Sequence, residues 1–95
     1  MKITWLPRAR IAREVAIDYI AQENPFAALE QLDEIERQTD LLLAHPEMGR
    51  AGRVIDTREL VINHSPFLLV YRIHHNVIQI LHFLHGAQQW PTTSI

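Results

Sequence analysis

The spacing of apolar residues predicts a strand and then a helix at the start of the chain. Residues 2–6 (KITWL) are a short run of β-branched and aromatic side chains, which is typical of a strand. From residue 7 to about residue 22 the apolar positions recur at helical spacing, and Pro7 suits the first helical position, where its missing N–H would be unpaired anyway. The predicted apolar stripe of this helix is Ile11, Ala12, Val15, Ala16 and Tyr19.

A second helix is predicted directly after the first. Asn24-Pro25 ends the first helix, because a residue before proline avoids the α region, and Asn24 can cap the helix that Pro25 opens. The pattern continues to about His45, which gives roughly 20 residues and about 30 Å. A link this short predicts an antiparallel hairpin, whose apolar faces must cover a sheet. The predicted core stripe is Ala28, Leu32, Ile35, Thr39 and Leu42, widened by Leu29 and Leu43.

The second half of the chain alternates strand patterns with short links. Residues 46–52 contain two glycines and a proline and are predicted as a connector. Strands are predicted from residue 53 or 58 to 63, over 67–73 and over 77–84, and the links between them are of hairpin length. These three strands should form an antiparallel meander with residues 67–73 at its centre, because residues 67–70 are apolar on both faces. The predicted class is α+β.

Length, charge and composition limit the possible functions. Ninety-five residues without cysteine predict one domain, residues 1–95, with no disulfide or thiolate chemistry. The first 48 residues carry five cations and nine acids (−4), and the rest carry four cations and two acids (+2). This weak basic footprint disfavours binding to free nucleic acid. We find no signal peptide, and the longest apolar run, residues 67–71, is far below the ~18 needed for a membrane span, so we expect a cytoplasmic protein.

Several local patterns, taken in order, resemble one family of toxins. They are Tyr19-Ile20-Ala21, Asn24-Pro25 with Ala27-Ala28, Pro46 with Gly49-Arg50 and Gly52-Arg53-Val54, Thr57-Arg58-Glu59-Leu60-Val61, Val70-Tyr71-Arg72-Ile73, Leu84-His85-Gly86-Ala87, and Trp90-Pro91. Together with the predicted order of elements, they resemble the RelE/ParE superfamily of type II toxin–antitoxin systems over nearly the whole chain. The resemblance implies the fold of an N-terminal strand, a helical hairpin and a three-stranded meander.

The superfamily has two activities, and only site residues separate them. RelE-type members are ribosome-dependent endoribonucleases that cut mRNA, whereas ParE-type members poison DNA gyrase and need no catalytic site. RelE-type nucleases tend to carry lysines on the first meander strand and an arginine early in the next. This chain has Arg58 and Glu59 on the first strand and Leu68 at the arginine position, and its tail after Gly86 lacks cations and tyrosine. The resemblance therefore favours a ParE-like, non-catalytic toxin and leaves the enzyme question open.

The nuclease alternative has specific candidates. RNA cleavage needs a base, an acid and a cation beside the phosphate, and Arg58, Glu59, Arg72 and His85 could be cast in those roles. Arg58 and Glu59 should point to opposite faces of their strand, however, and Arg72 could instead be paired with Glu59 or Asp56. His82 and His85 should also lie on opposite faces, so we expect no metal site and no cofactor.

The resemblance also implies partners. A cognate antitoxin should cover apolar grooves or sheet edges of the chain and neutralise it, and the target should be DNA gyrase, or ribosome and mRNA in the alternative. Candidate contact residues for the target or the antitoxin are Arg50, Arg53, Arg58, Arg72 and Trp90. A third hypothesis is a decayed toxin that binds its antitoxin but harms nothing.

Overall fold

A five-stranded sheet carries a helical hairpin on one of its faces. The computed structural model describes residues 1–86 and residue 90, so Ala87 and Pro91 of the C-terminal pattern lie outside the described residues. The elements are β1 (Lys2–Trp5), α1 (Pro7–Glu23), α2 (Pro25–Asp40), the 3-10 helix η1 (Leu41–Leu43), β2 (Arg50–Ala51), β3 (Arg58–Val61), β4 (Phe67–His74) and β5 (Val77–His85). The predicted α+β class is confirmed. Within the described part of the chain, no helix is long and apolar enough to cross a membrane.

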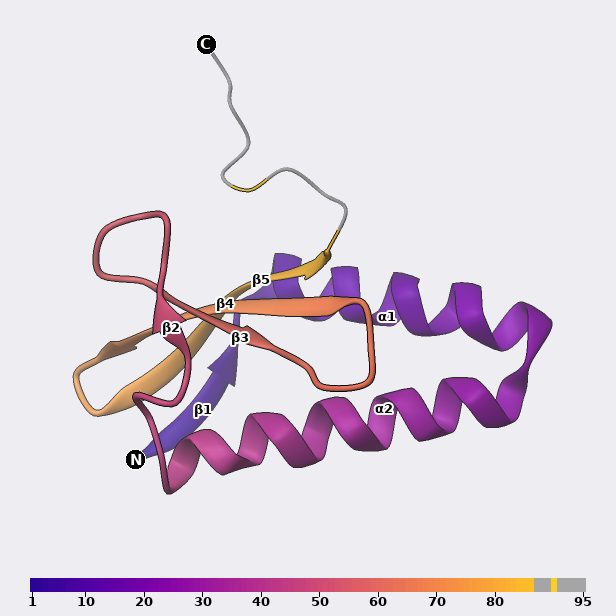
Figure 1. Ribbon diagram of the computed structural model, residues 1–95, viewed down its shortest axis with the longest axis horizontal. Coiled ribbons are helices and arrows are strands. Elements are labelled where there is room, and N and C mark those ends of the chain that lie inside the picture. Colours follow the sequence, from indigo (N-terminus) through magenta and orange to yellow (C-terminus); the bar gives the residue numbers. More distant parts are fainter. Residues whose placement is uncertain (87–89, 91–95) are drawn as a thin grey trace, which may run out of the picture.

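The strands lie in the order β1-β5-β4-β3-β2. β3, β4 and β5 form the predicted antiparallel meander, and β4 is central, with Phe67 through Val70 buried. β2 is a two-residue strand inside the segment predicted as a connector, so that prediction was incomplete. β1 pairs in parallel with β5, a position that the sequence did not predict. Figure 1 shows α1 and α2 side by side, with the tip of their hairpin extending well beyond the strands.

A bulge in β5 decides which of its side chains face the helices. Val70 lies opposite His82 and Tyr71 opposite Ile80, so Leu81 is the extra residue. Ile80 and Phe83 therefore both join the core beneath the helices, despite the odd spacing between them. His82 lies on the other side of the sheet. We call this second side, which no helix covers, the open face.

The predicted core stripe of α1 was wrong for its large residues. Ile11, Val15 and Tyr19 are 52%, 63% and 71% exposed. The core side of this helix combines three alanines with two isoleucines, while the predicted large residues lie on the flank. The residues that pack on the core are Ala9, Ala12, Ala16, Ile17 and Ile20.

The second helix follows its prediction more closely. Asn24 caps it, with its Oδ1 accepting from the Ala27 N–H at 3.1 Å. The core side holds Ala28, Ile35, Thr39 and, in η1, Leu42, but the predicted flanking residues Leu29 and Leu43 are exposed. The α-helix ends at Asp40 and not near His45, because the chain tightens into a 3-10 turn before Pro46.

The outer edge of β3 is mostly covered. β2 pairs with Arg58 and Glu59, and the buried amide of Gln38 on α2 pairs with both backbone groups of Asn63. Gln38 Nε2 donates to the Asn63 carbonyl at 3.3 Å, and the Asn63 N–H donates to Gln38 Oε1 at 2.8 Å. This edge therefore offers little room for a strand from another chain.

Candidate functional site

Glu59 is a buried carboxylate on the open face that binds two arginine residues. Its side chain is 1% exposed, and Arg50 Nη2 donates to Oε1 at 3.0 Å while the Arg53 N–H donates to Oε2 at 2.9 Å. Burial alone would raise the pKa of this carboxyl, but these hydrogen bonds and the two arginine charges outweigh it and lower the pKa below its ordinary value. Glu59 is therefore a buried, ionised anchor and is poorly placed to act as a general base.

The open face also binds part of the C-terminal segment. Arg53 Nη1 donates to the Trp90 carbonyl at 2.6 Å, and the Trp90 ring lies 4.3 Å from the His82 ring, tilted by 51°. Burial, and then the Arg8 charge, lower the pKa of His82, so its imidazole is neutral at pH 7. The sequence named Arg53 and Trp90 as separate contact candidates, and the structure brings them together.

Arg58 fastens the segment before β2 to the sheet. Its Nη1 donates to the carbonyls of Gly49 at 2.9 Å and Glu47 at 3.3 Å. The buried Tyr71 hydroxyl supports the same segment, accepting from the Gly49 N–H at 2.9 Å and donating to the Pro46 carbonyl at 2.8 Å. Arg58 and Glu59 lie on opposite faces of β3, as predicted, and both have structural partners.

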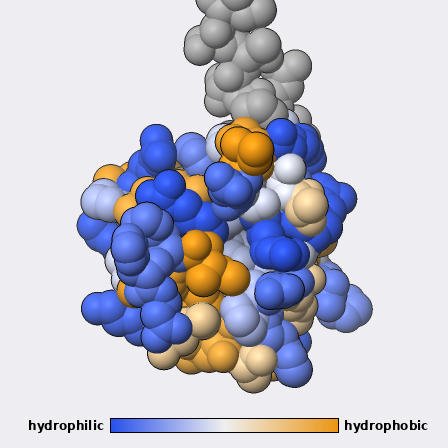
Figure 2. All heavy atoms as spheres, turned by 90° about the vertical axis from the view of Figure 1, so that its left-hand side faces the viewer, coloured by the Kyte–Doolittle hydropathy of each residue, from blue (hydrophilic) through white to orange (hydrophobic). Residues whose placement is uncertain are grey.

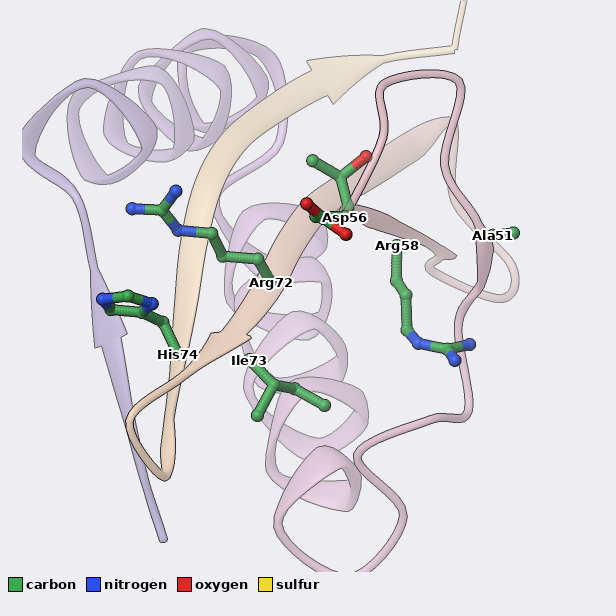
Figure 3. A pocket seen from close by; sticks show the side chains of 7 residues that line it. Ala51, Asp56, Arg58, Arg72, Ile73 and His74 are labelled. Carbon is green, nitrogen blue, oxygen red and sulfur yellow. The ribbon is translucent and has the colours of Figure 1, made fainter.

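Arg72 lies on β4 and is exposed. Its Nε donates to Gln79 Oε1 at 2.7 Å on the neighbouring strand, so its side-chain partner is this amide and neither Glu59 nor Asp56, the two alternatives that the sequence left open. Arg72, Asp56 and Arg58 line a shallow hollow of about 470 Å³, together with apolar residues such as Ile73. Figure 3 shows the Arg58 and Arg72 side chains pointing away from one another, so they do not converge on a common ligand position.

His85 lies at the end of β5, opposite Phe67 in the register. Arg58 is opposite Tyr71, four residues further along β4, which separates the two by about 13 Å along the strand. The His85 ring packs edge-on against the Phe67 ring at 6.1 Å. Because His82 contacts Trp90 on the open face, the two histidines lie on opposite sides, as predicted. The four nuclease candidates are therefore not brought together.

An apolar groove runs along α1, and the sequence did not predict it. It has a volume of about 520 Å³ and lies between the flank of α1 and the ends of β4 and β5. Its main walls are Val15, Tyr19, Phe67, Phe83 and His85. Figure 2 views the opposite, sheet end of the molecule, where apolar side chains form patches among charged and polar ones. The signal in the sequence was the set of apolar residues of α1, which includes Val15 and Tyr19 although neither is needed for the core.

Comparisons with known proteins agree with this arrangement. The family described as "ParE toxin of type II toxin-antitoxin system, parDE" matches residues 3–90. A protein of Sinorhizobium fredii (strain NBRC 101917 / NGR234), named "Putative toxin Y4kP", is 38% identical over 90 residues, which cover 95% of this chain and 93% of the relative. The solved structure of the chromosomal ParDE toxin–antitoxin system from P. aeruginosa matches with a TM-score of 0.80 and 26% identity, covering 90% of this chain and 95% of that one. The chain therefore belongs to the ParE family of type II toxin–antitoxin toxins.

Proposed function

We propose that this ParE-family toxin inhibits growth in the cytoplasm by binding and poisoning DNA gyrase, without cleaving RNA. The observation that carries the proposal is the engagement of the buried Glu59 carboxylate by Arg50 and Arg53. General-base catalysis requires a carboxylate that can reach the proton of its substrate. Glu59 cannot do so without breaking its ion pairs, and His85 and Arg58 are too far apart to act on one phosphate.

Leu68 supports the same proposal. It lies on the open face, opposite Val61 of β3, and is 7% exposed, at the position where a RelE-type nuclease would carry an arginine. A leucine side chain cannot donate a hydrogen bond to a phosphate, and arginine is the residue suited to that contact. With no cation at this position, binding to a protein target accounts better for toxicity than RNA cleavage does.

The proposal includes an antitoxin that covers the apolar groove along α1. An exposed groove lined by aromatic and aliphatic side chains is suited to an amphipathic helix of a partner. Val15→Glu would place a charge in this groove and should weaken the toxin–antitoxin complex by at least tenfold. Phe26→Glu is the matched control, because Phe26 is 79% exposed but lies outside the groove. Equal affinities of the two variants in titration calorimetry would exclude the groove as the antitoxin site.

Two assays on purified toxin test the mode of action. Gyrase poisoning predicts inhibited supercoiling and accumulated cleaved DNA, with mRNA on programmed ribosomes left intact. A ribosome-dependent nuclease predicts the reverse, with cleavage lost in His85→Ala and kept in the control His45→Ala. In cells without antitoxin, gyrase poisoning should produce DNA damage and filamentation before transcripts are lost. Normal growth in that experiment would indicate a decayed toxin.

A further inference from the structure

Three hollows on the described surface adjoin one another and form a continuous path. The groove along α1 and a hollow of about 250 Å³ on the open face share Pro66 and Phe67, at the start of β4. That hollow shares Arg50 and Val61 with a third hollow of about 400 Å³, which lies between the end of α2 and the outer edge of β3. We call the second and third hollows together the edge groove. A partner that fills the groove along α1 can therefore continue into the edge groove without leaving the surface.

The backbone of Val61 is unpaired at the edge of the sheet. The Ile62 N–H donates to a carbonyl of β4, so the alternation of the strand turns the N–H and C=O of Val61 away from β4. On that outer side β2 pairs with Glu59, and Gln38 pairs with Asn63. Val61 lies between these two contacts, and no group in the described part of the chain pairs with its backbone. An extended segment of another chain can use such edge groups, and because the unpaired stretch is one residue long, it suits a segment that crosses the edge.

The edge groove has apolar walls that are exposed to water. Val61 is 51% exposed, and Leu41 and Met48, which line the same hollow, are each 40% exposed. Pro66 and Leu68 continue the apolar lining on the open face. Single exposed apolar side chains are ordinary, but several gathered in one hollow indicate an interaction site. An apolar side chain of a partner would displace water from these walls.

Positively charged side chains also line the edge groove. Arg37, Arg50 and Arg53 have side chains that are 60%, 59% and 49% exposed. The carboxylates that pair with them are less accessible, since Glu34 beside Arg37 is 29% exposed and Glu59 beneath the other two is 1% exposed. Three guanidinium groups against two carboxylates leave a net positive charge, and most of the accessible charge is positive. The edge groove therefore favours a segment that combines acidic and apolar residues.

We propose that the edge groove binds an extended, acidic segment of the antitoxin, continuous with the helix that fills the groove along α1. One residue of this segment pairs with the backbone of Val61 and places an apolar side chain against Met48. The carboxylates of the segment face Arg37 and Arg50. Continuity with the groove along α1 favours the antitoxin over the toxin's target as the source of the segment. The inference rests on the proposed function in taking the antitoxin as the partner and that groove as the site of its helix.

Affinity measurements with the purified antitoxin of the same module provide the first test. Val61→Glu removes an apolar contact and places a negative charge against the acidic segment, so it should weaken binding at least tenfold. Ile55→Glu is the matched control, because Ile55 is 85% exposed and lines neither groove, and it should leave the affinity within about twofold. Equal affinities of these two variants would overturn the inference.

A second pair of variants tests the charge of the segment. Arg37→Gln should weaken binding by about three- to tenfold at low salt, and the loss should shrink in high salt, which screens exposed charges. Arg10→Gln removes a comparable ion pair with Glu14 on α1, outside both grooves, and should leave the affinity within about twofold. A loss in Arg37→Gln no larger than that in Arg10→Gln would contradict an acidic segment at this site.

Hydrogen exchange of the wild-type toxin, followed by NMR, does not depend on how well the variants fold. In the free toxin the unpaired Val61 N–H should exchange quickly, whereas the Ile62 N–H, which donates to β4, should exchange slowly. Bound antitoxin should slow the exchange of Val61 by at least about tenfold. Fast exchange of Val61 in the complex, or slow exchange with gyrase in place of the antitoxin, would overturn this inference alone. An antitoxin that does not bind the wild-type toxin would overturn the proposed neutralisation as well.

Discussion

Replacing Tyr71 by phenylalanine should remove two hydrogen bonds while leaving the packing of the ring intact. Tyr71 is fully buried, and its hydroxyl joins the Gly49 N–H to the Pro46 carbonyl. Gly49 is itself buried, so the variant leaves its N–H without a partner and without water. The Pro46 residue is only partly buried, and its carbonyl can turn to solvent.

The loss of stability follows from what happens to these two backbone groups. An ordinary hydrogen bond contributes about 1 kcal/mol net, and a buried donor left unpaired costs about 1–3 kcal/mol. Tyr71→Phe should therefore lower the free energy of unfolding by about 2–3 kcal/mol. In a domain of this size, 1 kcal/mol corresponds to roughly 4–8 °C, so Tm should fall by roughly 10–20 °C.

Thermal and chemical unfolding followed by circular dichroism measure this loss. Tyr19→Phe is the matched control, because Tyr19 is 71% exposed and the change should stay within about 0.5 kcal/mol. A loss of less than about 0.5 kcal/mol in Tyr71→Phe would refute the reasoning, since it would show that the hydroxyl does not hold the segment before β2.

The same variant should also change how stability depends on pH in alkaline solution. Burial raises the pKa of the Tyr71 hydroxyl above its ordinary value of 10.0. The unfolded chain therefore releases this proton first, and the contribution of Tyr71 to stability is lost as the pH rises above 10. Tyr71→Phe should show a smaller loss of stability in that range than the wild type.

Three further predictions concern the open face and its support. Because the pKa of Glu59 is lowered, the contribution of its carboxylate to the stability of the fold should be lost as the pH falls below about 4.5. Glu59→Gln should therefore be less stable than the wild type at pH 7 but should approach it near pH 3. The pKa of His82 is lowered by burial, so the wild type should lose stability as the pH falls below about 6.5. The free energy of unfolding of His82→Gln should depend less on pH in that range. A Cβ on Gly49 would lie 2.7 Å from the Tyr71 ring, so Gly49→Ala should lower the free energy of unfolding by about 1–3 kcal/mol. Gly86→Ala should lower it less, because its added Cβ would lie 3.1 Å from the Pro66 carbonyl oxygen. Equal unfolding free energies of the two variants would contradict this prediction.

Local features of the sequence determined most of the elements. Asn24 and Pro25 set the boundary between the helices because proline restricts the residue before it and asparagine can accept the first-turn N–H. The links after β3 and β4 are too short for anything but antiparallel neighbours, which made the meander predictable. The separation of Arg58 from Glu59, and of His82 from His85, also followed from the alternation of strand side chains, although the bulge at Leu81 was not foreseen.

Tertiary structure decided which face of each element is buried and which charges meet. α1 packs Ala12, Ala16, Ile17 and Ile20 on the core and leaves Val15 and Tyr19 exposed, although all of these residues fit a helical apolar pattern. Arg53 forms hydrogen bonds with Glu59 and Trp90, and the Trp90 ring contacts the His82 ring, across separations of up to 37 residues in the sequence. Such contacts depend on how the strands, helices and loops pack together, and the local spacing of residues does not predict them. The sequence alone therefore identified the elements and the residue types of the candidate site, and the packing of those elements determined its geometry.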